Sequence, residues 1–400
     1  MKNFLKDIRI LDLTSVVVGP ICTWRLSQYG ANVTKLEAPS GDLMRGLGGQ
    51  SPTGQHSGAY LHLNRGKRNI SLNLKDGAAK PILDKLVEQN DVIVTNMRPQ
   101  ALKKLGLDPD TIRKKYPEKI YCTITGYGSD GTYAGSPAYD SVIQAATGIT
   151  SLFDVRDGKP SYIPLLICDH VTGEIAAGTV LAAIVNKITT GEGASIEIPM
   201  FETMANFVLQ EHLAQKSFSP SIGEIGDKRL LDANTSPLKT ADGWISVTAN
   251  TDQQVKTFLE CIDREDLIED ARFKTIGDRA KNVKDWLKIR SDALINKNTA
   301  DWLAIFKSSD ISAMPCHTLE SLMEDEHLIS IGMFDTEQHP TEGQTISLRS
   351  SMLFNGVPLP KQQPAQPKGW DTESILKELG FTPEEIDKFV LSSVAIKHIA

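Results

Sequence analysis

The stretch that decides the fold runs from Ile8 to Leu36 and reads IRILDLTSVVVGPICTWRLSQYGANVTKL. It opens with a short apolar run at residues 8–13, which is typical of a buried strand. Gly19-Pro20 then marks a break, and a helical stretch continues to about Tyr29. A second apolar run follows at residues 33–36. Strand, helix and strand at this spacing predict two parallel strands joined by a crossover helix.

The same alternation continues through the first half of the chain. Further strands are predicted at residues 70–74, 91–94, 120–124 and 195–198. The helices predicted between them span residues 78–89, 99–105, 110–115 and 174–188. Alternating strands and helices at this spacing predict an α/β fold with a parallel, doubly wound sheet.

The second half has a different pattern. Residues 217–237 are polar and rich in turn residues, which is typical of a linker. Residues 242–321 predict a smaller α+β domain, with a strand at 244–249 and helices at 253–261, 283–295 and 299–308. Strand character returns at 338–354, and a connector rich in proline and glutamine follows at 362–368. Two helices, from 371 to 379 and from Pro383 onward, are predicted to close the chain.

The composition is that of an ordinary globular protein. The 400 residues carry a formal net charge of −7, so we expect binding neither to nucleic acid nor to anionic membranes. The first residues lack the features of a signal peptide, and we see no run of about 18 apolar residues, so we expect a cytoplasmic protein without a membrane span. Five scattered cysteines without metal-ligand spacing predict reduced thiols and no metal site: Cys22, Cys122, Cys168, Cys261 and Cys316.

Asp169 stands at the junction of two segments of different character. An apolar, strand-like run at residues 163–168 precedes it, and a helix rich in alanine and glycine follows. Aspartate is among the best N-capping residues, and Glu174 adds an acidic group near the helix start. A partly desolvated carboxylate at the end of a strand can also act as a nucleophile. From these residues alone, both interpretations remain open.

One motif is misleading. Residues 126–131, Gly-Tyr-Gly-Ser-Asp-Gly, follow a predicted strand and match the GxGxxG pattern of dinucleotide-binding sites. That pattern binds pyrophosphate only where a helix begins at the third glycine. Here residues 132–137 are a poor helix start, so we expect no nicotinamide or flavin site.

An ordered set of segments points elsewhere. In chain order they are Val18-Gly19-Pro20, residues 30–37, 64–75, 91–99 and 124–128, Pro137-Ala138-Tyr139-Asp140 with Gln144-Ala145, and Asp169 followed by Thr172-Gly173. In this order they closely resemble the class III CoA-transferases, the family that includes the formyl-CoA and carnitine CoA-transferases. The resemblance runs from about residue 8 to residue 333. Each segment alone is weak evidence for this family, whereas the ordered set is specific to it.

The resemblance implies an architecture and an assembly. Its members are interlocked homodimers with a discontinuous, Rossmann-like large domain and a smaller domain. We therefore expect residues 1–200 and 330–400 to form a large CoA-binding domain and residues 225–325 the small α+β domain. Residues 201–224 and 326–340 would be linkers through which two chains interlock.

The resemblance also implies a chemistry. Asp169 would be the nucleophile that accepts CoA from an acyl-CoA thioester, forms an aspartyl-CoA thioester and passes CoA to a free carboxylic acid. No permanently bound cofactor is needed, because coenzyme A enters and leaves as substrate. Tyr139 and Asp140 match the active-site pair beside the nucleophile, the first as a hydrogen-bond donor and the second as an orienting group. Alternatively, Tyr139 is a buried tyrosine and Asp140 a helix cap.

Eight residues match the family's CoA-binding positions: Val16, Leu72, Asn73, Lys75, Asn96, Met97, Arg98 and Lys104. Arg98 and Lys104 are suited to phosphate groups. His170 lies beside Asp169, but the resemblance gives it only a structural or supporting role.

Departures from the family pattern bear on the substrate. Position 17 is Val and position 38 is Ala, and the glycine-rich loop of the formyl-CoA transferases has no counterpart. A larger or less polar acyl group, or a dicarboxylate such as succinate, therefore fits better than formate or oxalate. An α-methylacyl-CoA racemase-like activity is a rival, although it needs a histidine where this chain has Tyr139, and tyrosine is a poor base near neutral pH. A CoA-binding protein without catalysis is the third possibility.

Overall fold

The computed structural model describes residues 4–398 and is built on a seven-stranded sheet in the order β14-β3-β2-β1-β4-β5-β6. The strands are β1 (Arg9–Leu13), β2 (Asn32–Glu37), β3 (Lys67–Leu72), β4 (Val92–Thr95), β5 (Ile120–Thr125), β6 (Ala194–Pro199) and β14 (Ala395–Ile396). Six strands are parallel, and β14 pairs antiparallel with β3. The order of the parallel strands is that of doubly wound dinucleotide-binding folds, with the direction of winding reversing between β1 and β4. The prediction of an α/β fold with a parallel sheet is confirmed.

Helices cover both faces of this sheet. One face packs its leucines and isoleucines, such as Leu11 and Ile93, against apolar side chains of α3 (Lys80–Gln89), α5 (Pro109–Lys115) and α16 (Thr372–Glu378). The side chain of Asp12, the next residue along β1, lies on the opposite face and binds Thr23 of α1 (Val18–Gln28). Because side chains alternate along a strand, each strand serves both layers. The first unit also contains α2 (Gly58–Leu63), α4 (Pro99–Leu105), α6 (Asp140–Ala146), α17 (Pro383–Leu391) and the start of α9 (Met200–His212).

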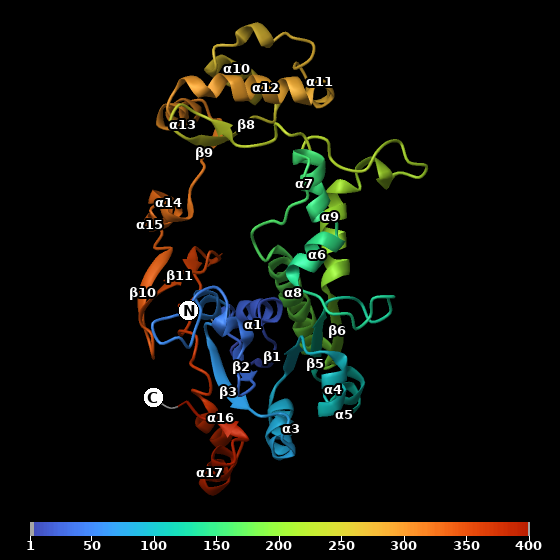
Figure 1. Cartoon of the computed structure of the whole chain (residues 1–400), viewed down its shortest axis with the longest axis vertical. Coiled ribbons are helices and arrows are strands. Elements are labelled where there is room, and N and C mark those ends of the chain that lie inside the picture. Colours follow the sequence, from blue (N-terminus) through green and yellow to red (C-terminus); the bar gives the residue numbers. More distant parts are fainter. Residues whose placement is uncertain (1–3, 399–400) are drawn as a thin grey trace. The chain divides into compact units, whose positions relative to one another are not determined.

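The helix that carries Asp169 is longer than expected. α8 (Ile167–Thr190) begins seven residues before the predicted start at Glu174, and residues 163–166 form no strand. It lies beside α1 (Figure 1) and buries a stripe of small residues that includes Ala176, Ala177 and Val180. By length and composition alone α8 could cross a membrane. Core helices of soluble proteins also meet these two criteria, and 39% of the apolar stretch is buried inside the molecule.

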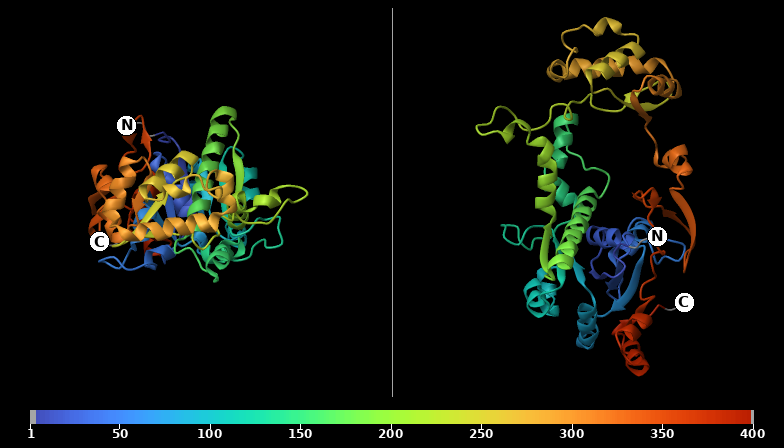
Figure 2. Two further views of the ribbon diagram at one scale, coloured as in Figure 1. Left: turned by 90° about the horizontal axis from the view of Figure 1, so that it is seen from above. Right: turned by 180° about the vertical axis from the view of Figure 1, so that it is seen from behind.

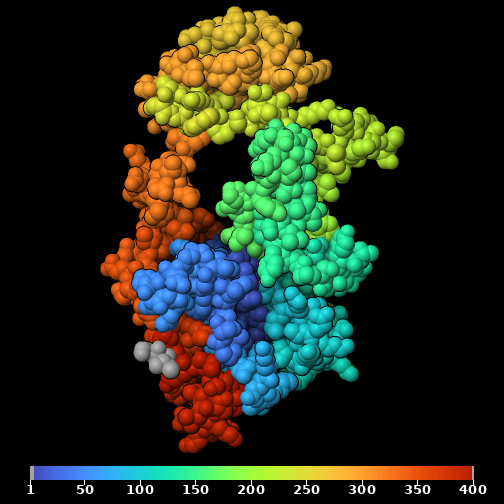
Figure 3. Space-filling view, in the orientation of Figure 1, coloured from blue at the N-terminus to red at the C-terminus, as the bar shows by residue number. Residues whose placement is uncertain are grey.

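The end of the chain returns to the sheet built by its beginning. Asn69 of β3 accepts a hydrogen bond from the amide of Gly369 through Oδ1 at 2.7 Å. Its own amide donates to Asp371 at 2.8 Å, so the Asp371 side chain binds β3 instead of capping α16. In Figure 3 the C-terminal residues, in red, pack against the first hundred residues, in blue. Two antiparallel pairs precede this segment: β10 (Phe334–His339) with β11 (Gly343–Leu348), and β12 (Leu353–Phe354) with β13 (Val357–Pro358).

A second compact unit comprises residues 148–161 and 207–326. Its antiparallel sheet has the order β7 (Leu238–Lys239), β8 (Trp244–Thr248), β9 (Ser312–Pro315). Its helices are α7 (Ile149–Asp157), α10 (Asp252–Cys261), α11 (Ile276–Lys281), α12 (Val283–Ala293), α13 (Thr299–Ser308) and α14 (Leu319–Met323), and the short α15 (Glu326–Ser330) starts at its last residue. Aromatic residues such as Phe258, Trp286, Trp302 and Phe306 fill the core. Figure 2 shows the later part of this unit, in yellow and orange, from two further directions. Residues 148–161, which the sequence analysis placed in the large domain, group with this unit.

Candidate active site

Asp169 is the third residue of α8, and only 9% of its surface is exposed. The N-cap position is Leu166, so Asp169 does not cap this helix, and that interpretation was wrong. Burial raises the pKa of Asp169 to about 7, and the neighbouring charge of Asp140 adds to the rise. A carboxylate in the first turn of a helix faces the positive end of the helix dipole, which favours the ionised form. Because its pKa is about 7, the side chain exchanges between its protonated and ionised forms near neutral pH.

Asp140 binds the beginning of α8 from another helix. It is the first residue of α6 and is buried. Its Oδ2 accepts the backbone N–H of Cys168 at 2.7 Å and that of Asp169 at 3.1 Å. These two amides belong to the first turn of α8, where the N–H groups have no partner within the helix. Asp140 therefore caps α8 across a separation of 29 positions in the sequence.

Gln144 supports this arrangement. Its Nε2 donates to Oδ1 of Asp140 at 2.6 Å and to the carbonyl of Leu165 at 3.1 Å. Its Oε1 accepts the amide of Ile163 at 2.9 Å. The segment before α8 is thereby fastened to α6, which fixes where α8 begins.

The other residues around Asp169 differ in accessibility. Tyr139 is 64% exposed, so the alternative of a buried tyrosine was wrong, and its hydroxyl has no recorded partner within residues 4–398. His170 is exposed as well. Cys168 is fully buried, and burial raises the pKa of its thiol to about 12, so it is protonated at neutral pH. Thr172 lies one turn after Asp169 and was given no role from the sequence, and its buried hydroxyl lacks a hydrogen-bond partner in the described part of the chain.

The loop between β1 and α1 adjoins this part of α8. Val18 is the first residue of α1. A Cβ atom at Gly173 of α8 would lie 2.6 Å from the Val18 carbonyl oxygen, so α1 and α8 meet backbone to backbone. Ser15 of this loop exchanges two hydrogen bonds, at 3.0 and 2.9 Å, with Asn96, which follows β4. Asn96, predicted to bind CoA, therefore also holds the backbone that precedes Val16.

A cavity of about 1180 Å³ opens at the carboxyl ends of β1, β2, β3 and β4. Ligands of doubly wound folds bind at this edge, next to the point where the winding reverses. Five of the eight predicted CoA-binding residues line the cavity: Leu72, Asn73, Lys75, Met97 and Lys104. Val16, Asn96 and Arg98 do not line it, although Ser15 and Met97, their neighbours in sequence, do.

The unneutralised charge in this cavity is positive. Its two acidic residues are paired, Glu37 with Arg45 at 2.8 Å and Asp42 with Lys35 at 2.9 Å. Lys75 and Lys104 are exposed and form no recorded ion pair among the residues that the structure describes. The two free ammonium groups suit an anionic ligand such as a phosphate ester.

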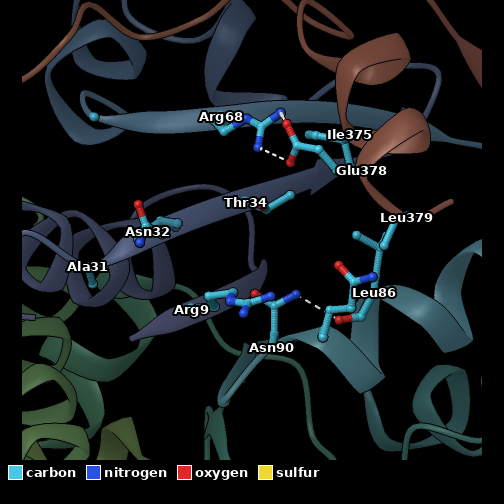
Figure 4. A pocket seen from close by; sticks show the side chains of 13 residues that line it. Arg9, Ala31, Asn32, Thr34, Arg68, Leu86, Asn90, Ile375, Glu378 and Leu379 are labelled. Atoms are coloured by element: carbon cyan, nitrogen blue, oxygen red, sulfur yellow. Dashed lines mark hydrogen bonds and ion pairs between the residues drawn. The ribbon is translucent and has the colours of Figure 1, made fainter. Parts of the chain in front are cut away.

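A second cavity, of about 350 Å³, lies at the opposite edge of the sheet (Figure 4). It is lined by residues at the start of the strands, such as Arg9 and Asn32. Arg68, which points into it, is already bound to both oxygens of Glu378 at 2.6 and 2.9 Å. Most of its polar lining is therefore satisfied within the protein.

Buried charges next to the β1–α1 loop were also missed. Asp12, Lys35 and Lys67 lie on β1, β2 and β3, and all three are buried. Burial lowers the pKa of Lys67 to about 8, although the nearby Asp12 favours its charged form. A charged residue inside an otherwise apolar strand was the available signal, because parallel strands buried on both faces are normally apolar.

The structure brings no metal-binding cluster together: within residues 4–398, no three His, Cys, Asp or Glu side chains are arranged to hold an ion. All five cysteines are free thiols.

Comparisons with known proteins identify the family of the chain. The family model of CoA-transferase family III matches residues 5–372. The chain is 30% identical over 401 residues to succinyl-CoA:glutarate CoA-transferase of Mus musculus, covering 98% of this chain and 91% of the relative. It is 28% identical over 402 residues to (R)-2-hydroxy-4-methylpentanoate CoA-transferase of Clostridioides difficile, covering 98% and 99%.

A solved structure gives the same result. The crystal structure of a CAIB/BAIF family protein from Brucella suis superposes with a TM-score of 0.79 at 25% sequence identity, covering 94% of this chain and 99% of that one. Since the family model, the relatives and the fold extend over nearly the whole sequence, the chain belongs to CoA-transferase family III.

Proposed function

We propose that this protein transfers CoA from an acyl-CoA thioester to a free carboxylic acid, with Asp169 as the nucleophile. The observation that carries the proposal is the buried Asp169 carboxyl group, whose pKa is raised to about 7 and whose helix is held by Asp140. A desolvated carboxylate is a stronger nucleophile than a hydrated one, and it still ionises at neutral pH.

The proposed reaction proceeds through two acyl exchanges at Asp169. The carboxylate attacks the thioester carbonyl, the carbon–sulfur bond breaks, and CoA thiolate leaves an aspartyl anhydride behind. The thiolate then attacks the Asp169 carbonyl, which forms an aspartyl-CoA thioester and releases the donor acid. The acceptor carboxylate reverses both steps. No oxidant, reductant or water is consumed.

Other residues take supporting roles in this proposal. Tyr139 is exposed, so its hydroxyl is available to donate a hydrogen bond to a reacting carbonyl oxygen. Asp140 orients the backbone of Asp169 and keeps its pKa high.

We propose that the large cavity binds CoA. Leu72, Asn73 and Met97 would contact the nucleotide and pantetheine, and Lys75 and Lys104 the phosphates. Arg98 is exposed at the start of α4, just outside the cavity, and is a further candidate for phosphate. Val16 follows β1 and Asn96 follows β4, and both would meet the thioester end.

The acyl group is proposed to be larger than formyl. Val17 is buried and apolar, so it offers no polar group to a formyl or oxalyl unit. The two enzymes compared above are named for a dicarboxylate and for a branched 2-hydroxy acid. A dicarboxylate such as succinate or glutarate and a branched acid are therefore the first acids to test.

We also propose a homodimer. α8 leaves the apolar side chains of Ile175, Val185 and Ile188 exposed. Apolar side chains left exposed along one helix are available for an interface with a second chain. Sedimentation should find a dimer down to nanomolar concentration, and a stable folded monomer would contradict the proposal.

Trapping the intermediate tests the mechanism. The protein is incubated with succinyl-CoA and treated with borohydride or hydroxylamine, and the peptide containing Asp169 is examined by mass spectrometry. Reduction to the alcohol, or conversion to the hydroxamate, is expected at Asp169 and at no other carboxylate. Turnover with no label at Asp169 would disprove the covalent mechanism. Deuterium exchange at the α-carbon of a 2-methylacyl-CoA without an acceptor acid would instead support racemisation.

A further inference from the structure

The loop between β1 and α1 contains a strained residue. Val16 has a φ of +70°, in the left-handed region. A β-branched residue rarely adopts this conformation, and where it does the surrounding structure must hold it there. Gly19 completes the tight turn, because a Cβ atom at that position would lie 2.3 Å from Thr14 Cβ.

Asp42 binds the strained residue directly. Its Oδ1 accepts the backbone N–H of Val16 at 3.0 Å, and the same oxygen accepts the N–H of Met44 at 2.9 Å. Asn96 fixes the preceding residue, Ser15, by two hydrogen bonds. The backbone is thus held on both sides of the Ser15–Val16 peptide bond.

Lys35 completes the arrangement from β2. Its ammonium group pairs with Oδ2 of Asp42 at 2.9 Å and donates to the carbonyl of Thr14 at 2.9 Å. The side chains of Lys35 and Asp42 are each only 1% exposed. A buried pair of this kind seldom adds much stability by itself, since desolvation offsets the attraction. Its geometry, by contrast, fixes Thr14 and Val16 at once.

This loop is linked to both parts of the candidate site. Thr14, Ser15 and Asp42 line the large cavity. After Val16 the chain enters α1, and Val18 contacts Gly173, four residues after Asp169 on α8. A change in the Val16 backbone would therefore move the cavity wall and the start of α1 against the helix that carries Asp169.

We propose that Asp42 is a positioning residue for CoA transfer: it holds Val16 in the left-handed conformation, and Lys35 holds Asp42, so that the bound thioester meets Asp169 in the reactive geometry. This inference rests on the proposed function and adds a residue to it. Asp42 acts through the Val16 backbone and takes no part in bond making.

The test compares two variants that carry no unpaired buried charge. Lys35→Met/Asp42→Asn keeps an oxygen acceptor for the Val16 amide, whereas Lys35→Met/Asp42→Leu removes it. Turnover is measured with succinyl-CoA and glutarate, or with the fastest pair from a panel of acids. We expect kcat of the leucine variant to be about tenfold below that of the asparagine variant, while KM for succinyl-CoA differs much less.

Rescue separates positioning from general damage. Glycine adopts positive φ without strain, so Val16→Gly should restore most of the lost kcat in the leucine variant. Ser15→Gly is the matched control: it adds the same flexibility one residue earlier, where φ is not positive, and should restore nothing. Equal kcat in the two parent variants, or equal rescue by both glycines, would overturn the inference.

A separate variant distinguishes the two possible failures. Asp169→Asn should abolish turnover in the otherwise unchanged enzyme. If it remains active, the proposed function fails, whatever the result at Asp42. If it is inactive and the two variants at position 42 turn over equally, only the inference about Asp42 fails.

Discussion

Gly173 and Val18 leave no space for a side chain between them. A Cβ atom at Gly173 would lie 2.6 Å from the Val18 carbonyl oxygen and 2.8 Å from Ile21 Cβ. Since α8 carries Asp169 and α1 continues from the strained loop, this contact sets the spacing between the two parts of the candidate site. A side chain at position 173 should therefore push α1 and α8 apart.

Gly173→Ala should destabilise the fold by about 1–3 kcal/mol, the usual cost of overpacking a core, and should lower kcat. Gly178→Ala is the matched control on the same helix, because no described atom lies within 4 Å of a Cβ there. It should be neutral or stabilising by up to about 1 kcal/mol, since alanine favours helix over glycine. Chemical denaturation checks both, and equal effects would contradict the proposed contact.

Asp169→Asn should abolish CoA transfer and yet stabilise the protein at alkaline pH. The folded carboxyl group holds its proton up to about pH 7, whereas an unfolded aspartate loses it near pH 4. The native state therefore loses stability as the pH rises between these values. Asparagine removes this penalty. The free energy of unfolding of the variant should therefore exceed that of the unchanged protein by about 4 kcal/mol at pH 8, and the difference should vanish near pH 4. Unfolding curves at both pH values check the prediction, and an equal gain at both would argue against the raised pKa.

The pH profile should depend on Asp140. Since the carboxylate of Asp169 is the reactive form, kcat/KM should rise with pH through a midpoint near 7. Asp140→Asn removes the neighbouring charge, so the midpoint should move to lower pH, although burial still holds it above the ordinary value. Glu174→Gln is the control, because Glu174 lies on the same helix but is paired with Arg25. An unmoved midpoint in the Asp140 variant would show that its charge does not act on Asp169.

Lys104→Ala should weaken CoA binding by about tenfold, the loss of roughly one charge-assisted contact, while kcat changes little. Lys103→Ala removes the same charge from the neighbouring position on α4, which does not line the cavity, and should have a much smaller effect. Calorimetric titration with free CoA measures both. Similar losses of CoA affinity in the two variants would mean that Lys104 attracts CoA only at long range and does not contact it.

Much of the fold could be predicted because it depends on local patterns. The helix at residues 299–308 was predicted residue for residue as α13, and the strand at 244–249 matches β8 to within one residue. The start of α8 could not be predicted, because the group that caps it, Asp140, lies 29 positions earlier. Local sequence shows a cap only when the capping residue is adjacent.

The candidate site residues were chosen on a different basis, the resemblance to a family. Asp169, Asp140 and the cavity residues came from an ordered set of segments, and the structure places Asp140 against Asp169 and five of the eight residues around one cavity. The Lys35–Asp42 pair and the conformation of Val16 were missed. Both exist only through tertiary contacts, since a lysine is stable in the interior only when the fold supplies its partner.

The two-residue strand β14 covers the edge of β3 late in the order of synthesis. Ala395 and Ile396 pair with Leu72 and Ser71 of β3, so a strand made early in synthesis lacks this partner until residues 395 and 396 have been made. Until then the polar backbone edge of β3 is open to pairing with another chain. Chains truncated before residue 395 should therefore depend more on chaperones, and aggregate more readily, than chains that include β14.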